Sequence, residues 1–191
     1  MKTLIRGAAV GLALALTAQA AQAQGGLSLG LGAGVVIPNG SMADYNSTGY
    51  TGQASLRLLP PASPLGFQVD GFYSRLGLQN DIDGHSQMIG GTANAVYAFS
   101  SASVARPYLI GGVGVYNNKL TVDDIGSGSV TKFGANAGAG FDFQLGAASL
   151  YAEGRFHAIF KAAVDAETLE ETTAYMIPLT VGLRFEASAG G

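Results

Sequence analysis

TKFGANAGAGFDFQL, residues 131–145, alternates apolar residues with polar residues or glycine almost without interruption. From position 133 the odd-numbered residues are phenylalanine, alanine or leucine, whereas the even-numbered ones are glycine, Asn136, Asp142 and Gln144. Successive side chains of a β-strand point to opposite faces, so a period of two indicates a strand with one apolar face. An amphipathic helix has a period of 3.6 residues and does not produce this pattern. The stretch therefore predicts a strand between an apolar and a polar environment.

Seven further segments show the same alternation. In one of them, PYLIGGVGVY, both faces are apolar or glycine, and there we expect Leu109, Val113 and Val115 to face outward. Eight such segments predict an all-β protein, an eight-stranded antiparallel up-and-down transmembrane β-barrel. The seven segments are residues 26–36, 50–59, 65–76, 87–99, 107–116, 150–157 and 175–185.

The N-terminus has the features of an export signal. Lys2 and Arg6 precede the apolar run GAAVGLALAL, which is too short for the roughly 20 residues of a transmembrane helix. Ala21 and Ala23 satisfy the small-x-small cleavage pattern, so we expect the signal peptide to be cleaved after Ala23. An uncleaved N-terminal anchor helix is the alternative. The expected organisation is a signal peptide at 1–23, a barrel domain at 24–185 and a short tail at 186–191.

The composition of the expected mature chain limits its function. Removing 23 of 191 residues leaves 168, which suits one domain. Without Lys2 and Arg6 there are 8 basic and 13 acidic residues, a net charge of −5, which argues against nucleic acid as a partner. The sequence contains no cysteine, so it forms neither disulfides nor thiolate metal sites.

The connectors between the segments differ in length, which predicts an orientation. Short turns face the periplasm and longer loops face outward in barrels of this kind, so both termini should be periplasmic. The short connectors are 60–64, 100–106 and 146–149, and the longer ones are 37–49, 77–86, 117–130 and 159–173.

Aromatic residues at outward positions should collect where hydrocarbon meets the headgroups. Two belts follow from the alternation. A soluble, lipocalin-like barrel would turn its apolar face inward, and parity alone does not separate the two cases; the belts favour the membrane. One belt comprises Phe67, Phe99, Phe143 and Phe185 near the short turns, and the other Tyr50, Tyr73, Phe133, Phe156 and Tyr175 near the long loops.

Three stretches resemble a known family: RPYLIGGVGVY (106–116), GANAGAGFDFQLGAASLYAEGRFH (134–157) and IPLTVGLRF (177–185). Over residues 24–185 the chain resembles the small outer-membrane β-barrel proteins of the OmpA/OmpX type. The resemblance implies localisation in the outer membrane of a Gram-negative cell envelope and recognition by the barrel insertion machinery. The C-terminal assembly signal that it implies consists of Leu179, Val181, Leu183 and Phe185.

Six charged residues fall at inward positions, three of each sign. We expect them to form one ionic layer in the periplasmic half of the barrel, with opposite charges on neighbouring strands paired, because buried charges need partners. An eight-stranded barrel has room inside only for side chains or one small ligand, so this layer should close the lumen. A gated ion path through the layer is the alternative. The six residues are Arg57, Asp70, Asp142, Glu153, Arg155 and Arg184.

The sequence gives little indication of a catalytic or metal-binding site. His85 lies beside Ser86 in an expected outer loop and His157 at an inward position, without the arrangement that a His- and Ser-dependent hydrolase needs. We expect no enzyme activity, no cofactor and no metal site. The acidic residues of the outer loops suit a solvated rim, or cation bridging to lipopolysaccharide phosphates. They are Asp44, Asp81, Asp83, Asp123, Asp124, Asp165, Glu167, Glu170 and Glu171.

These features predict an outer-membrane barrel with a structural or envelope-surface role and a side-chain-plugged lumen. Its expected partners are outer-membrane lipid, lipopolysaccharide and, during assembly, the insertion machinery; we expect a monomer. The leading alternative is a narrow or gated, porin-like channel for ions or small solutes. Adhesion or partner binding through the outer loops is a third possibility, and a soluble ligand-binding barrel is a fourth.

Overall fold

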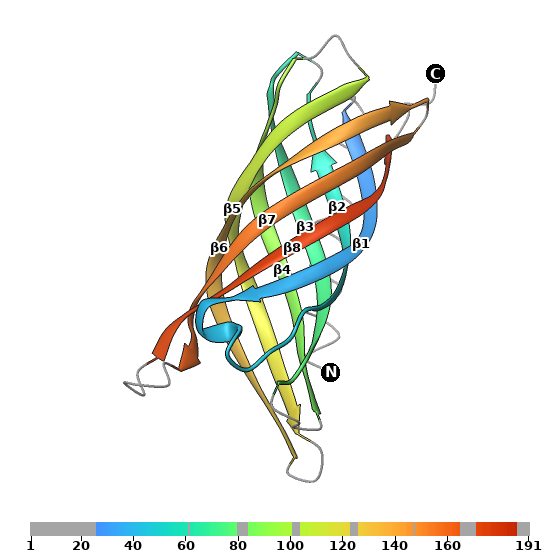
Figure 1. Ribbon diagram of the computed structural model, residues 1–191. Helices are drawn as coiled ribbons and strands as arrows, with labels where there is room; N and C mark the ends of the chain where they lie inside the picture. Colours follow the sequence, from blue (N-terminus) through green and yellow to red (C-terminus); the bar gives the residue numbers. More distant parts are fainter. Residues whose placement is uncertain are drawn as a thin grey trace, which may run out of the picture.

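Eight antiparallel strands close into a barrel in the computed structural model, which confirms the predicted fold class (Figure 1). Each strand pairs with its neighbours in sequence, and the last pairs with the first. The structure describes residues 26–60, 62–79, 84–100, 104–122, 126–146, 148–164 and 171–186. The strands are β1 (Leu27–Asn39), β2 (Gly49–Leu58), β3 (Leu65–Gly77), β4 (Gly84–Ala98), β5 (Ala105–Val122), β6 (Gly126–Leu145), β7 (Ala148–Val164) and β8 (Glu171–Glu186).

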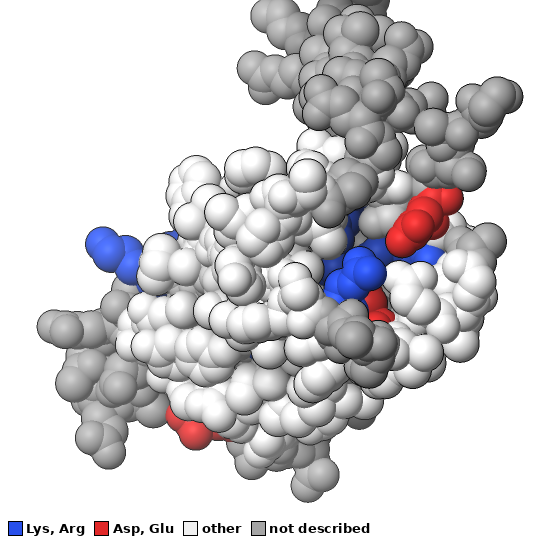
Figure 2. Space-filling view, turned by 90° about the horizontal axis from the view of Figure 1, so that it is seen from above, with Lys and Arg blue, Asp and Glu red and all other residues white. Residues whose placement is uncertain are grey.

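The two faces of the strands follow the alternation in the sequence. On β6, Phe133 is 73% exposed on the outer wall, whereas Asn136 is 6% exposed inside. Leu109, Val113 and Val115 of β5 face outward, as predicted. Seen from the short-turn end, charged atoms are visible inside the mouth of the barrel, whereas most of the wall carries no charged residue (Figure 2). The barrel therefore presents an apolar outer surface, the arrangement that a lipid environment requires.

Every residue of the two predicted aromatic belts is at an outward position of its strand or next to its end. Residues of both belts take part in aromatic pairs: Phe156 and Tyr175 stack with ring centroids 5.3 Å apart, and Phe99 contacts Tyr97 at 5.0 Å. The first pair joins adjacent strands, because Tyr175 pairs with Ala158 in the β7–β8 ladder.

Two of the predicted long loops are largely strand. Residues 117–122 pair with 126–131 as a continuation of the β5–β6 ladder, and β7 and β8 pair as far as Val164 and Glu171. The prediction of loops at 117–130 and 159–173 was wrong because backbone N–H and C=O groups are satisfied by extending an existing ladder. This lengthened β5–β6 hairpin projects beyond the rest of the barrel at the end opposite the short turns (Figure 1).

The connector after β1 contains a short helix rather than a simple loop. η1 (Gly40–Met42) follows β1 directly, and Met42 is 5% exposed, packed into the interior at the loop end. Gly40 begins this turn at φ +58°, a conformation that favours glycine. No helix within the described ranges is long and apolar enough to cross a membrane.

The expected signal peptide, residues 1–23, lies outside the described residues, as do residues 187–191 of the expected tail. Both boundaries therefore remain predictions. The barrel itself is described from Leu27 to Glu186, with short gaps at some of its connectors.

Candidate functional site: the ionic network of the lumen

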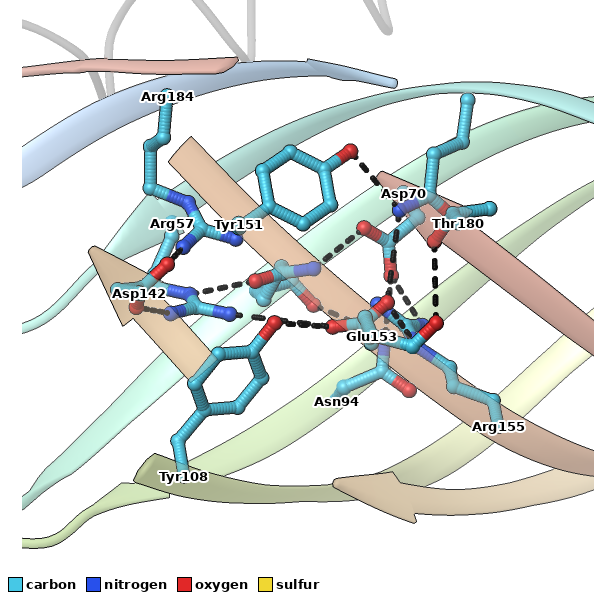
Figure 3. A network of polar contacts seen from close by, with 12 residues as sticks. Arg57, Asp70, Asn94, Tyr108, Asp142, Tyr151, Glu153, Arg155, Thr180 and Arg184 are labelled. Atoms are coloured by element: carbon cyan, nitrogen blue, oxygen red, sulfur yellow. Dashed lines mark hydrogen bonds and ion pairs between the residues drawn. The ribbon is translucent and has the colours of Figure 1, made fainter. Parts of the chain in front are cut away.

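The six predicted lumen residues lie together inside the barrel (Figure 3). Each side chain occupies an inward position of its strand and lies nearer to the short-turn end than to the loop end. Their exposed fractions range from 2% to 8%, so the charges are removed from water. They come from five strands: Arg57 from β2, Asp70 from β3, Asp142 from β6, Glu153 and Arg155 from β7, and Arg184 from β8.

Asp142 is the centre of one half of the network. Arg57 Nη1 lies 2.9 Å from Asp142 Oδ2, and Arg184 Nη1 binds the other carboxylate oxygen, Oδ1. Arg57 also donates from Nε to Gln68 Oε1 at 2.5 Å. One carboxylate thus holds two guanidinium groups, one on each of its oxygens.

Arg155 is the centre of the other half, where one guanidinium holds two carboxylates. Its Nη1 lies 2.6 Å from Asp70 Oδ2 and its Nε lies 2.7 Å from Glu153 Oε1. Asp70 accepts three further hydrogen bonds, from Gln68 Nε2 at 2.6 Å, Thr92 Oγ1 at 3.0 Å and Asn94 Nδ2 at 2.8 Å. Charge-assisted bonds of this kind are stronger than neutral ones and fix the geometry of the cluster.

Gln68 and Tyr108 connect the two halves, since Gln68 accepts from Arg57 and donates to Asp70. Tyr108 and a second tyrosine, Tyr151, were not selected from the sequence. Tyr108 donates its hydroxyl to Glu153 Oε2 at 2.9 Å, while the Arg57 guanidinium lies 4.2 Å from the centre of its ring. The Arg184 guanidinium lies 4.7 Å from the centre of the Tyr151 ring. Both tyrosines have the inward parity of their strands, and this signal could have found them. Cation–π contacts of this kind are worth about 2 kcal/mol when desolvated.

None of the ion pairs among the six residues joins neighbouring strands, so that part of the prediction was wrong: Arg155 and Glu153 share β7, and other pairs cross the lumen. Arg57 on β2 reaches Asp142 on β6, and Arg155 on β7 reaches Asp70 on β3. Inward side chains of a narrow barrel converge on its axis, and arginine is long enough to meet a carboxylate from the far wall. The network therefore fills the cross-section of the barrel.

Apolar side chains fill the lumen on the loop side of the network, and a smaller apolar cluster packs beside the network at the short-turn end; the sequence analysis predicted neither. The two clusters differ in size, and both consist mainly of inward-facing strand residues. The cluster toward the loop end comprises Val36, Met42, Leu76, Met88, Tyr116, Ile159, Ala174 and Met176, with Phe72 packed against it. The cluster at the short-turn end comprises Val96, Ala98, Tyr108 and Ile110, with Leu59 packed against it.

The two histidines occupy different environments. His157 is buried on the loop side of the network, with Nδ1 2.8 Å from the hydroxyl oxygen of Tyr116. His85 lies on β4, not in a loop as expected, and its Nε2 is 2.7 Å from Gln87 Nε2. Ser86, next to it, points into the barrel and donates to Asn118, so the pair does not form a histidine–serine site.

Metal ligands do not cluster in the part of the chain that the structure describes. Within it, no group of three or more His, Cys, Asp or Glu residues could hold a metal ion. Asp44 lies in the described connector after η1, whereas Glu171 is placed only by its backbone. The other acidic residues of the expected rim lie outside the described residues: Asp81, Asp83, Asp123, Asp124, Asp165, Glu167 and Glu170.

A closed eight-stranded barrel with an apolar wall and a filled polar interior defines the class of small outer-membrane barrels. The sequence profile of the outer membrane protein beta-barrel domain family matches residues 7–185, and the chain belongs to this family. Its place is therefore the outer membrane of a Gram-negative type of envelope. Comparison with curated proteins gave no match.

Solved structures with the same fold include Neisserial surface protein A, at 18% identity and a TM-score of 0.66, covering 85% of this chain and 97% of that one. A major outer membrane protein from Thermus thermophilus is 13% identical with a TM-score of 0.55, over 84% and 99% of the two chains. The N-terminal barrel of Pseudomonas aeruginosa OprF is 17% identical with a TM-score of 0.50, over 85% and 100%. At these identities the likeness concerns the fold alone.

Proposed function

We propose that the protein is a monomeric structural barrel of the outer membrane, with a lumen closed to ions and small solutes. One observation carries this proposal: ion pairs cross the lumen, and a large apolar cluster fills it on the loop side of these pairs. A solute would have to displace packed apolar side chains and break desolvated ion pairs. In this role the outer wall and the loops, not the lumen, face the partners of the protein.

Conduction tests the proposal directly. Purified protein reconstituted into planar bilayers should carry little steady current, because the ion pairs Arg57–Asp142 and Arg155–Asp70 cross the lumen. A porin reconstituted in the same way provides the positive control. Large, stable conductance steps would contradict a closed lumen, and neutralising Arg155 should then change the ion selectivity.

A gated channel is the second candidate, and one feature favours it. Within the described residues, Nη2 of Arg57, Arg155 and Arg184, and Nε of Arg184, have no hydrogen-bond partner. Buried donors without partners are costly, so the network is less stable than a fully satisfied one and could rearrange. In that case brief current steps, not steady current, would appear when voltage is applied.

Orientation is a further part of the proposal, with the short turns in the periplasm and the β5–β6 hairpin outside. An epitope tag inserted between Val122 and Gly126 should be labelled by antibody on intact cells. The same tag inserted in the turn at 60–64 should be labelled only after the outer membrane is permeabilised. The reverse result would invert the topology.

Assembly involves the C-terminal strand in this proposal. Leu179, Val181, Leu183 and Phe185 of β8 all face outward, with 42% to 61% of each residue exposed. This row would be available to the insertion machinery before β8 pairs with β1 and closes the barrel. Recognition by that machinery, and contact of the finished barrel with lipopolysaccharide, are inferred from the family and from this exposure.

A further inference from the structure

The outer wall is not uniform, because a groove of about 540 Å³ runs across β3 to β7. Its volume is within the range of roughly 300–1,000 Å³ typical of ligand sites. Its walls are apolar and consist of Val69 on β3, Val113 on β5, Phe133 on β6 and Phe160 on β7. Residues on the outer wall of this barrel face lipid, so the occupant of the groove must have an apolar part.

Small residues on β4 make the floor of the groove. Gly91 and Ala93 lie between Val69 on one side and Val113 and Val115 on the other. A Cβ added at Gly91 would meet nothing closer than a backbone oxygen at 3.5 Å, so the position is open toward lipid. The floor is thus lower than the walls because its residues have small side chains or none, and an extended acyl chain fits such a depression.

Basic side chains stand on the loop side of this groove. Arg75 on β3 pairs with Gln87 on β4, and Gln87 pairs with Lys119 on β5, so the three form one outward row. Gln87 is four residues from Gly91, which places the row roughly 13 Å beyond the groove floor at about 3.3 Å per residue. Arg75 and Lys119 are separated by one strand, hence by about 10 Å.

A bulge in β7 adds a third cation beside the groove. The β7–β8 register shifts between Ile159 and Ala163, and Lys161 has φ 52°, in the left-handed region. Phe160 and Lys161 are consecutive, yet both are exposed. In a regular strand they would point to opposite faces. Lys161 is thus an exposed cation that directly follows Phe160, a residue of the groove wall.

The charge on this surface has one sign. In the described parts of β3 to β7, Asp70, Asp142 and Glu153 are buried inside, and no acidic side chain projects from the outer wall. Arg75, Lys119 and Lys161 form no ion pair with a described residue. A phosphate-bearing headgroup above the groove would complement them, as basic residues at membrane surfaces do.

We propose that this face binds lipid A, the phosphorylated glycolipid of lipopolysaccharide, with one acyl chain in the groove and its phosphates on the basic side chains. Lipid A carries phosphates at both ends of a disaccharide, which matches cations separated by a strand. A phospholipid offers one phosphate and meets only part of the row. The site rests on the proposed orientation, with the loop end in the outer leaflet, but is independent of the lumen.

Binding to the purified, folded protein in detergent tests the site, with lipid A as the probe and phosphatidylglycerol and inorganic phosphate as comparisons. We expect lipid A to bind well above both. The triple variant Arg75→Gln, Lys119→Gln, Lys161→Gln should bind it about a hundredfold more weakly, at roughly fivefold for each basic residue. Gly91→Leu should fill the groove and also weaken binding.

Matched variants control for general effects on the wall. Gly52→Leu adds the same side chain on β2, where the nearest atom to a new Cβ is 3.9 Å away, and should leave binding unchanged. Arg106→Gln removes an exposed charge from the short-turn rim, far from the groove, and should also be neutral. Migration before and after boiling shows whether each variant is folded. The proposed site would be wrong if phosphatidylglycerol bound as tightly as lipid A, or if the triple variant and Gly91→Leu bound lipid A with unchanged affinity. Neither result would affect the closed lumen, which the conduction measurements test separately.

Discussion

Glu153→Ala should destabilise the folded barrel by about 3–5 kcal/mol, the usual effect of removing one partner from a buried ion pair. Glu153 accepts from Arg155 Nε at 2.7 Å and from the Tyr108 hydroxyl at 2.9 Å. Its loss leaves Arg155 with Asp70 alone and gives the lumen a net positive charge. The measurement is urea titration of the protein folded into lipid vesicles, read as the free energy of unfolding.

Asn136→Ala provides a matched control, because it also truncates a buried, hydrogen-bonded side chain in the lumen. Asn136 donates to Asn94 Oδ1 at 2.8 Å, and loss of such a neutral bond costs about 1 kcal/mol. Glu153→Gln should fall between the two, since it keeps the shape and removes the charge. If Glu153→Ala were no more destabilising than Asn136→Ala, the ion pairs would not be what holds the lumen closed.

The direction of each side chain could be predicted from the sequence, because a strand of period two assigns every residue to a face. The alternation around Phe133 and Asn136 predicted the outer wall and the lumen correctly, and Leu109 followed in the less regular fifth segment. The same logic placed the six charged residues inside. It works here because lipid on one side and a filled lumen on the other select opposite residue types.

The partners inside the lumen could not be predicted in the same way. Arg57 and Asp142 are 85 positions apart, and their contact depends on barrel diameter, strand tilt and side-chain length together. Parity also gives no warning that the lumen becomes apolar toward the loop end, where Leu76 and Met88 are fully buried. These residues do have the inward parity of their strands, but we expected inward positions to be polar and therefore did not predict an apolar cluster there.

The ends of the strands were equally hard to place from the sequence. In segment 117–122 the outward positions, Asn117 and Lys119 among them, are polar because the strand has left the lipid, so the apolar outward row ends although the pairing continues. Backbone hydrogen bonds, not side-chain burial, hold this part of the hairpin. The sequence pattern therefore marks the lipid-spanning part of a strand, and the ladder can extend well beyond it.

Ala137→Arg should destabilise the barrel by about 2–4 kcal/mol, because it places a charge near the bilayer midplane on the lipid-facing side. Ala137 is exposed on β6, opposite Gly111 and Phe156, and about midway between Phe143 and Thr131. Urea titration in lipid vesicles again gives the free energy of unfolding.

Two variants on the same strand separate charge from size and from depth. Ala137→Met adds a long apolar side chain and should change stability little. Leu145→Arg introduces the same charge at the last residue of β6, where an interfacial position reduces the effect to about 0–1 kcal/mol. The depth dependence is the decisive result, because lipid penalises charge most at its centre. Equal effects of Arg at positions 137 and 145, or a neutral Ala137→Arg, would mean that this wall does not face the hydrocarbon of a membrane.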